Sequence, residues 1–141
     1  MNRIRMEFDA VSENERLARV CAVAFVSRLD PTLEEINDIK TAVSEAVTNC
    51  VIHGYQGKGG IVVMDAVIRD RELEIKIQDF GVGIENVEQA MEPLFTTGAE
   101  NERSGMGFTF MQMFMDELDV SSKPGEGTTV TMKKRIKEET V

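Results

Sequence analysis

Features of membrane proteins and of nucleic-acid-binding proteins are missing from this sequence. Its longest apolar run, Val20 to Val26, is far shorter than the roughly 18 residues that a membrane-spanning helix needs. The first residues, Met1 to Met6, lack the apolar segment of a signal peptide. Sixteen Lys and Arg stand against 25 Asp and Glu, and the resulting net charge of −9 repels nucleic acid and favours a partner with a basic surface. We therefore expect a cytoplasmic protein that binds neither membranes nor nucleic acid directly.

Cysteine and histidine are also scarce. The chain has two cysteines, Cys21 and Cys50, and one histidine, His53. Neither cysteine has a second Cys or His at metal-ligand spacing, and both lie in helical patterns, so we expect buried free thiols and no metal site made only of protein ligands. His53 stands just before Gly54 at a predicted helix end, where capping and the helix dipole explain it, so we expect a structural role.

The length of 141 residues fits one domain over residues 1–141, with room for one site. No internal repeat divides the sequence. Alternating apolar residues and turn residues predict a series of strands, the second and third of which form an antiparallel hairpin. The predicted strands cover residues 4–8, 61–69, 72–79, 118–122 and 128–136. A helix is predicted over 106–117.

Two capping boxes predict the starts of the first two helices. Ser12 with Glu15 and Thr32 with Glu35 have the required spacing, in which a hydroxyl and a carboxylate satisfy free N–H groups of the first turn. We therefore expect one helix from Ser12 to about residue 29 and a second that begins at Thr32 and stops at Gly54.

The first helix carries apolar residues that we expect to form its core-facing stripe: Leu17, Val20, Cys21 and Ala24. Arg16 and Arg19 fall to one side of this stripe and give an acidic protein a small basic patch. For either Arg alone, a solvated helix face is the favoured explanation. Together they are a candidate docking surface for a partner.

Glu45, Asn49 and His53 are spaced four residues apart, which places them along one face of the second helix. Burying a carboxylate and an amide near the core is costly unless they have partners. The amide oxygen of Asn49 is of the type that magnesium accepts, and Glu45 could orient or deprotonate a nucleophile. The alternative is that both are ordinary exposed helix residues.

Asp79 ends a predicted strand and is followed at once by two glycines, Gly81 and Gly83. This pattern places a carboxylate beside backbone that a ligand can approach closely, and the carboxylate could accept a hydrogen bond from an amine such as that of adenine. An ordinary turn is the alternative. Further on, Gly105 and Gly107 open a helix whose free N–H groups and dipole would favour phosphate.

Residues 84–104 have weak periodicity and are longer than a compact connection needs, which indicates a mobile lid. Arg103 stands at the end of this segment. Because a guanidinium there could reach a bound phosphate, Arg103 is a candidate contact to the γ-phosphate of a nucleotide.

Four motifs occur in the order and spacing of the GHKL ATPase superfamily: Glu45-x-x-x-Asn49, Asp79-x-Gly81-x-Gly83, Gly105-x-Gly107-Phe108 and Gly127-Thr128-Thr129. Within this superfamily the chain resembles the serine kinases that act as anti-sigma factors of sporulation, and the resemblance spans nearly all of it. The resemblance implies an α+β fold, a two-layer α/β sandwich of the Bergerat type. Its mixed, mainly antiparallel sheet would carry helices on one face.

The resemblance also implies roles for the matching residues. Asn49 is expected to bind magnesium, Glu45 to act as general base, and Asp79 to contact the adenine amine of ATP. The glycines let the nucleotide lie against the backbone or receive its phosphates: Gly81, Gly83, Gly105 and Gly107. Thr128 or Thr129 would help to hold adenine, and we prefer Thr128 because it directly follows Gly127.

The function implied by the resemblance has two parts. The protein would bind and inhibit a sporulation RNA polymerase sigma factor, and as an ATP- and magnesium-dependent serine kinase it would phosphorylate and inactivate its anti-anti-sigma antagonist. A homodimer is implied as well. A general-stress type of anti-sigma serine kinase has the same site residues and stays open, as does a nucleotide-dependent binding switch without catalysis.

Overall fold

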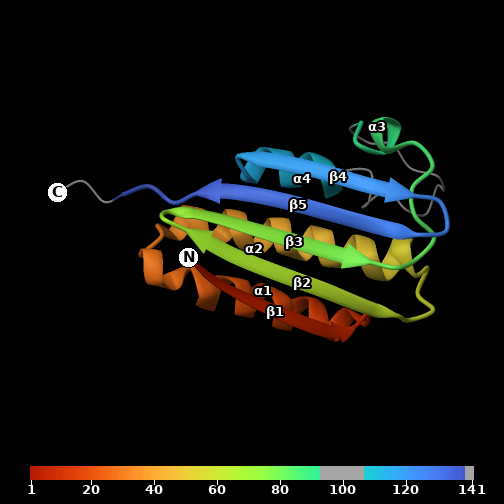
Figure 1. The fold of residues 1–141 in the computed structure, drawn as a ribbon, viewed down its shortest axis with the longest axis horizontal. Coiled ribbons are helices and arrows are strands. Elements are labelled where there is room, and N and C mark those ends of the chain that lie inside the picture. Colours follow the sequence, from red (N-terminus) through yellow and green to blue (C-terminus); the bar gives the residue numbers. More distant parts are fainter. Residues whose placement is uncertain (93–106, 139–141) are drawn as a thin grey trace.

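A five-stranded sheet and a layer of helices make up the part of the chain that the computed structural model describes, residues 1–92 and 107–138 (Figure 1). The strands are β1 (Asn2–Asp9), β2 (Ile61–Arg69), β3 (Glu72–Asp79), β4 (Glu117–Lys123) and β5 (Gly127–Arg135). They lie in the order β1-β2-β3-β5-β4, and every pairing is antiparallel. The α+β class and the hairpin are confirmed. The sheet of the described residues is antiparallel throughout, so the expectation of a mixed sheet is wrong.

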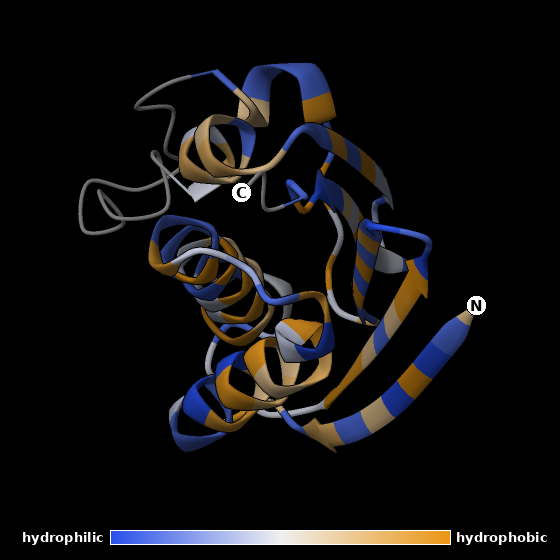
Figure 2. Ribbon diagram, turned by 90° about the vertical axis from the view of Figure 1, so that its left-hand side faces the viewer, coloured by the Kyte–Doolittle hydropathy of each residue, from blue (hydrophilic) through white to orange (hydrophobic). Residues whose placement is uncertain are grey.

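Helices α1 (Ser12–Val26), α2 (Leu33–Asn49) and α4 (Gly107–Phe114) lie on one face of this sheet (Figures 1 and 2). The 3-10 turn η1 (Ser27–Leu29) follows α1, and the π-helical turn η2 (Cys50–Gly54) follows α2. The short α3 (Val87–Ala90) lies beside the edge strand β4. Among the described residues, no helix has both the length and the apolar content of a membrane span.

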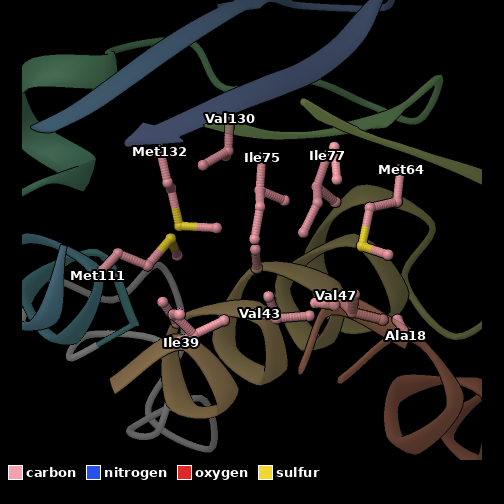
Figure 3. Close-up of a cluster of buried hydrophobic side chains, with 14 of the residues drawn as sticks. Ala18, Ile39, Val43, Val47, Met64, Ile75, Ile77, Met111, Val130 and Met132 are labelled. Atoms are coloured by element: carbon pink, nitrogen blue, oxygen red, sulfur yellow. The ribbon is translucent and has the colours of Figure 1, made fainter. Parts of the chain in front are cut away.

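The core lies between α2 and the inner face of the sheet (Figure 3). Ile39, Val43 and Val47 of α2 are fully buried because they recur at helical spacing and face the strands. The central strand β3 points every second side chain inward: Leu73, Ile75, Ile77 and finally Asp79. The alternation that builds the core therefore also carries a carboxylate into the interior at the strand end.

The buried stripe of α1 differs from the predicted one. Ala18, Ala22 and Val26 are completely buried, whereas Leu17 and Val20 remain 48% and 53% exposed. The expectation was wrong because two apolar rows run along this helix, and only the row of small residues allows α1 to pack closely beside the rest of the helical layer. Of the predicted buried thiols, Cys50 is buried and Cys21 only half-buried, and both are free.

One of the two predicted capping boxes forms. The Glu35 N–H donates to the Thr32 hydroxyl at 3.1 Å, and the Thr32 N–H donates to the Glu35 carboxylate at 2.9 Å. The box predicted at Ser12 does not form, because Ser12 is already the first residue of α1 and Val11 is its N-cap. Glu15 instead accepts a hydrogen bond from the Ser44 hydroxyl of α2. A tertiary contact between the two helices has replaced the local cap.

Removing the two predicted caps should therefore have unequal effects. Thr32→Ala is expected to lower the free energy of unfolding by about 1 kcal/mol, since it leaves the first turn of α2 without its side-chain acceptor. Ser12→Ala is the matched control and is expected to change it by less than about 0.5 kcal/mol, as an exposed position without a cap bond. Urea unfolding of the two variants measures the difference. Equal losses would contradict this assignment of the helix starts.

Candidate functional site

A cavity of about 1130 Å³ opens at the end of the sheet where β3 ends and β5 begins. Its walls come from the last turn of α2, from η2, from the segment after Gly83 and from the start of α4. Asn49, Cys50, Asp79, Phe108 and Thr128 are among the residues that line it. The volume lies slightly above the range of roughly 300–1,000 Å³ for small-molecule sites, so a nucleotide-sized ligand fits.

Asp79 is the buried charge of this cavity. Its side chain is the last inward one of β3, and the residue is only 3% exposed. The Gly81 N–H donates to its Oδ1 at 3.0 Å, and the Cys50 thiol and the Thr128 N–H are further hydrogen-bonding neighbours. Burial nevertheless raises the pKa of the carboxyl above its usual value of 3.8, although these donors lower it. Asp79 therefore offers a ligand a desolvated acceptor.

Two glycines, Gly54 and Gly81, allow the backbone of η2 to pack closely against Asp79 and the end of β3. A Cβ on Gly54 would lie 2.6 Å from the Asp79 Oδ2, and one on Gly81 would lie 1.9 Å from the Gly54 carbonyl oxygen. The Val82 N–H donates to that same carbonyl oxygen at 2.9 Å. The π-helical turn η2 thus packs its backbone directly onto the strand end, and only residues without a side chain fit at this contact.

Glu45 and Asn49 lie on α2 where α4 begins. A Cβ added to Gly107 would be 3.1 Å from the Asn49 Nδ2 and 3.4 Å from the Glu45 Oε2. The first turn of α4, with its free N–H groups, therefore lies directly against both side chains. Asn49 also lines the cavity. The structure brings these three predicted site residues together.

A magnesium ion fits this arrangement only if phosphate and water supply most of its ligands. Among residues 1–92 and 107–138, no group of three or more His, Cys, Asp and Glu side chains could hold a metal ion. Asn49 provides one amide oxygen at the cavity wall. Magnesium commonly binds in this way, through one or two protein oxygens together with substrate phosphates.

His53 does not continue the face formed by Glu45 and Asn49. The α-helix ends at Asn49, and His53 belongs to η2, whose wider turn breaks the four-residue repeat. The side chain lines the cavity, and its burial lowers the pKa of the imidazole below the usual 6.5. The predicted single face is therefore correct for two residues out of the three.

The two candidate threonines face opposite ways. Thr128 stands directly across from Asp79 in the pairing of β3 with β5, and residues opposite each other share a face of the sheet. Thr128 accordingly lines the cavity. Thr129 is paired with Gln78 and points to the other face, as strand alternation requires.

Some of the remaining predicted site residues lie in the described part of the chain, and others lie outside it. Gly83 and the residues that follow it to Ala90 contribute to the cavity wall. Arg103, Gly105 and most of the predicted lid lie outside the described residues. Arg16 is exposed on α1, and Arg19 there forms an ion pair with Glu15 at 3.8 Å.

Sequence reasoning missed several residues that shape the site. Cys50 was predicted only as a buried thiol and Gly54 only as a helix stop. Tyr55 was assigned no role, although its hydroxyl donates to the Ile61 carbonyl and accepts from the Phe80 N–H at 2.8 Å, which fixes the loop beside the strand end. Ser122 was likewise missed. No sequence pattern indicates the π-helical turn. The Gly54-Tyr55 pair directly after His53 is the local sequence signal that could have indicated these contacts.

Comparisons with known proteins agree with this geometry. Residues 8–134 match the model of the histidine kinase-like ATPase domain family. The chain is 59% identical over 135 residues to the anti-sigma F factor of Clostridium acetobutylicum, with 96% of this chain and 94% of that protein covered. It is 58% identical to the anti-sigma F factor of Caldanaerobacter subterraneus subsp. tengcongensis, with the same coverage.

Solved structures show the same fold at low identity. The RsbU and RsbW domains of Rv1364c from Mycobacterium tuberculosis superpose with a TM-score of 0.65 at 18% identity, covering 96% of this chain and 32% of the longer chain. The catalytic domain of the histidine kinase ThkA gives a TM-score of 0.57 at 12% identity, covering 94% of this chain and 96% of that one. These likenesses show the fold, and the family model and the sequence matches show that the chain belongs to the anti-sigma F factors, which are built on a histidine kinase-like ATPase domain.

Proposed function

We propose that this protein is an anti-sigma factor with two activities: it binds and inhibits a sporulation RNA polymerase sigma factor, and it uses ATP and magnesium to phosphorylate a serine of its anti-anti-sigma antagonist. The observation that carries the proposal is a nucleotide-sized cavity with a buried acceptor, Asp79, on one wall and the Glu45–Asn49 pair beside a helix start. The names of its relatives supply the sigma factor as partner.

Adenine is assigned to the inner end of the cavity. Asp79 accepts a hydrogen bond from the exocyclic amine, and Thr128 lies on the same face to assist it. Gly81 and Gly83 keep the backbone beside the base free of side chains. A buried carboxylate suits an uncharged amine donor because the base adds no second charge to the site.

The phosphates are assigned to the start of α4. Gly107 leaves room beside Asn49, whose amide oxygen would hold the magnesium ion, and Gly105 and Gly107 would expose backbone N–H groups to the phosphates. When bound, magnesium neutralises phosphate charge during transfer. Arg103 is proposed as the γ-phosphate contact and residues 84–104 as the lid over the nucleotide, within a single domain of residues 1–141.

Glu45 is assigned the proton transfer. Its carboxylate accepts the proton of the substrate serine while the serine oxygen forms a bond to the γ-phosphorus and the bond to the ADP oxygen breaks. Glu45 lies next to Asn49 at the start of α4, so the base and the metal ligand would meet the same phosphate. Positioning of this kind is the main requirement of phosphoryl transfer.

The sigma-binding surface is assigned to α1. Arg16 and Arg19 form its basic patch, and α1 is linked to the catalytic helix through the Ser44 hydroxyl, which donates to Glu15. A homodimer and a cytoplasmic location complete the proposal. A general-stress anti-sigma kinase would have the same site, and the identity of the partner separates the two.

The proposal is tested with purified protein, labelled ATP and candidate partners. With magnesium, label should appear on a serine of an anti-anti-sigma protein, and the same preparation should retain a sporulation sigma factor. Omission of magnesium is the control for transfer. Nucleotide-dependent retention of the sigma factor without any labelled serine would favour the non-catalytic switch, and failure to retain a sporulation sigma factor would refute the inhibitory half.

A further inference from the structure

The Ser122 hydroxyl is the centre of a hydrogen-bond network behind the cavity wall. The Ile84 N–H donates to its Oγ at 2.7 Å, the hydroxyl donates to the Gly127 carbonyl oxygen at 2.9 Å, and the Thr128 Oγ1 lies 2.8 Å away. Ser122 is half-buried in β4, next to the β5 strand that carries Thr128. Thr128 itself lines the cavity.

The direction of each hydrogen bond follows from counting protons. A serine hydroxyl has one proton and two lone pairs. The Gly127 carbonyl can only accept, so it takes the Ser122 proton, and the Ile84 N–H can only donate, so it takes one lone pair. For all three contacts to be hydrogen bonds at the same time, Thr128 must donate to the second lone pair. The Thr128 proton is thereby engaged, and its oxygen offers the cavity lone pairs alone.

This arrangement leaves hydrogen-bond acceptors, and no donor, on the two polar side chains Asp79 and Thr128 at the inner end of the cavity. Asp79 stands directly across from Thr128 on the same sheet face and offers carboxylate oxygens. With the Thr128 proton engaged by Ser122, both side chains accept hydrogen bonds. Such a pair suits a purine that carries an amino group at position 6 and disfavours one that carries a carbonyl oxygen there, because two facing acceptors repel.

We propose that Ser122 is a positioning residue for base specificity: by engaging the Thr128 proton, it makes the site select a 6-amino purine over a 6-oxo purine. The inference rests on the proposed placement of adenine against Asp79. Ser122 acts through Thr128 and touches no part of the nucleotide. Without its hydroxyl, the Thr128 hydroxyl can rotate and donate to a 6-oxo group.

The test compares ATP with inosine triphosphate, which carries a carbonyl oxygen in place of the amino group. Titration calorimetry with magnesium gives the ratio of the two dissociation constants for each variant. S122A is expected to reduce the preference for ATP by about 2- to 10-fold, the equivalent of one net hydrogen bond. S122T keeps a hydroxyl and is expected to retain the wild-type preference. In a T128V background, S122A is expected to cause no further change.

A purely structural role of Ser122 would produce a different result. Loss of the acceptor for the Ile84 N–H would weaken both nucleotides equally and leave their ratio unchanged, which would overturn the inference. If S122A does not fold, T128V alone must reduce the preference, and an unchanged ratio in T128V would overturn it as well. Wild-type protein that binds neither nucleotide would refute the proposed function, whereas binding with an unaltered ratio in S122A refutes this inference alone.

Discussion

Glu45→Gln is expected to slow phosphoryl transfer to the antagonist serine by about 10²- to 10⁴-fold, the usual contribution of a general base, while ATP binding persists. Glutamine has nearly the same shape as glutamate but cannot accept the serine proton. Because the change is almost isosteric, the contact of Glu45 with the start of α4 at Gly107 should be retained. Single-turnover transfer of labelled phosphate measures the rate, and calorimetry measures ATP affinity.

The matched control is Glu34→Gln, which makes the same substitution on the same helix at an exposed position in the first turn. It is expected to leave the transfer rate unchanged. A Glu45→Gln variant that transfers phosphate at the wild-type rate would remove Glu45 from the mechanism. A variant that loses ATP binding to the same extent as transfer would assign Glu45 to nucleotide binding instead.

The parts of the site that follow local periodicity could be predicted from the sequence. Strand alternation predicted that Asp79 ends the strand, and the structure places it at the end of β3, where it is the last inward-facing residue and 3% exposed. Helical spacing placed Glu45 and Asn49 together on α2, and both lie beside Gly107. In each case one regular element carries the residues, so that spacing along the chain determines spacing in space.

Periodicity gave wrong predictions where contacts between elements, or a change in helix type, determine the position of a residue. In α1 both apolar rows have helical spacing, and contact with neighbouring elements selected the row of Ala18 and Ala22. Glu15 had the spacing of a cap but pairs with Ser44 of α2. His53 had the spacing of a helix face, but α2 changes into a π turn before reaching it. None of these outcomes is encoded within the element itself.

Buried polar contacts between distant segments could not be predicted either. Lys134 is only 8% exposed, and its Nζ lies 3.3 Å from the Asp38 carboxylate and donates to the Phe114 carbonyl oxygen at 2.7 Å. In the sequence it is one of three consecutive basic residues at a strand end. Ser122 is a comparable case, since Ile84 is 38 residues away in the sequence and Thr128 becomes a neighbour only when β4 and β5 pair.

Asp79→Asn is expected to weaken ATP binding by about 10- to 200-fold, the equivalent of the roughly 1.5–3 kcal/mol of a hydrogen bond to a charged group. The fold should be retained, because an amide oxygen can still accept from the Gly81 N–H. The amide cannot offer two acceptors to adenine, and its NH₂ group would face the amine of the base. Calorimetry with ATP tests this, and wild-type affinity in Asp79→Asn would contradict the assignment of adenine to Asp79.

The same residue makes ATP affinity and stability depend on pH in opposite directions. Burial raises the native pKa of Asp79 above the usual 3.8, so ATP affinity should fall on acidification through this raised pKa as the carboxylate is protonated. The native state binds the proton more tightly than the unfolded state does. The contribution of Asp79 to the free energy of unfolding therefore decreases as the pH rises from the unfolded pKa through the native pKa, and it stays low above that range.

Asp79→Asn removes both dependences, so without nucleotide the variant should be at least as stable as the wild-type protein at neutral pH. Thermal melting with and without ATP over a pH series measures both effects. A variant that melts below the wild type at neutral pH without ATP would show that the ionised Asp79 stabilises the fold, contrary to the desolvation cost inferred from its burial.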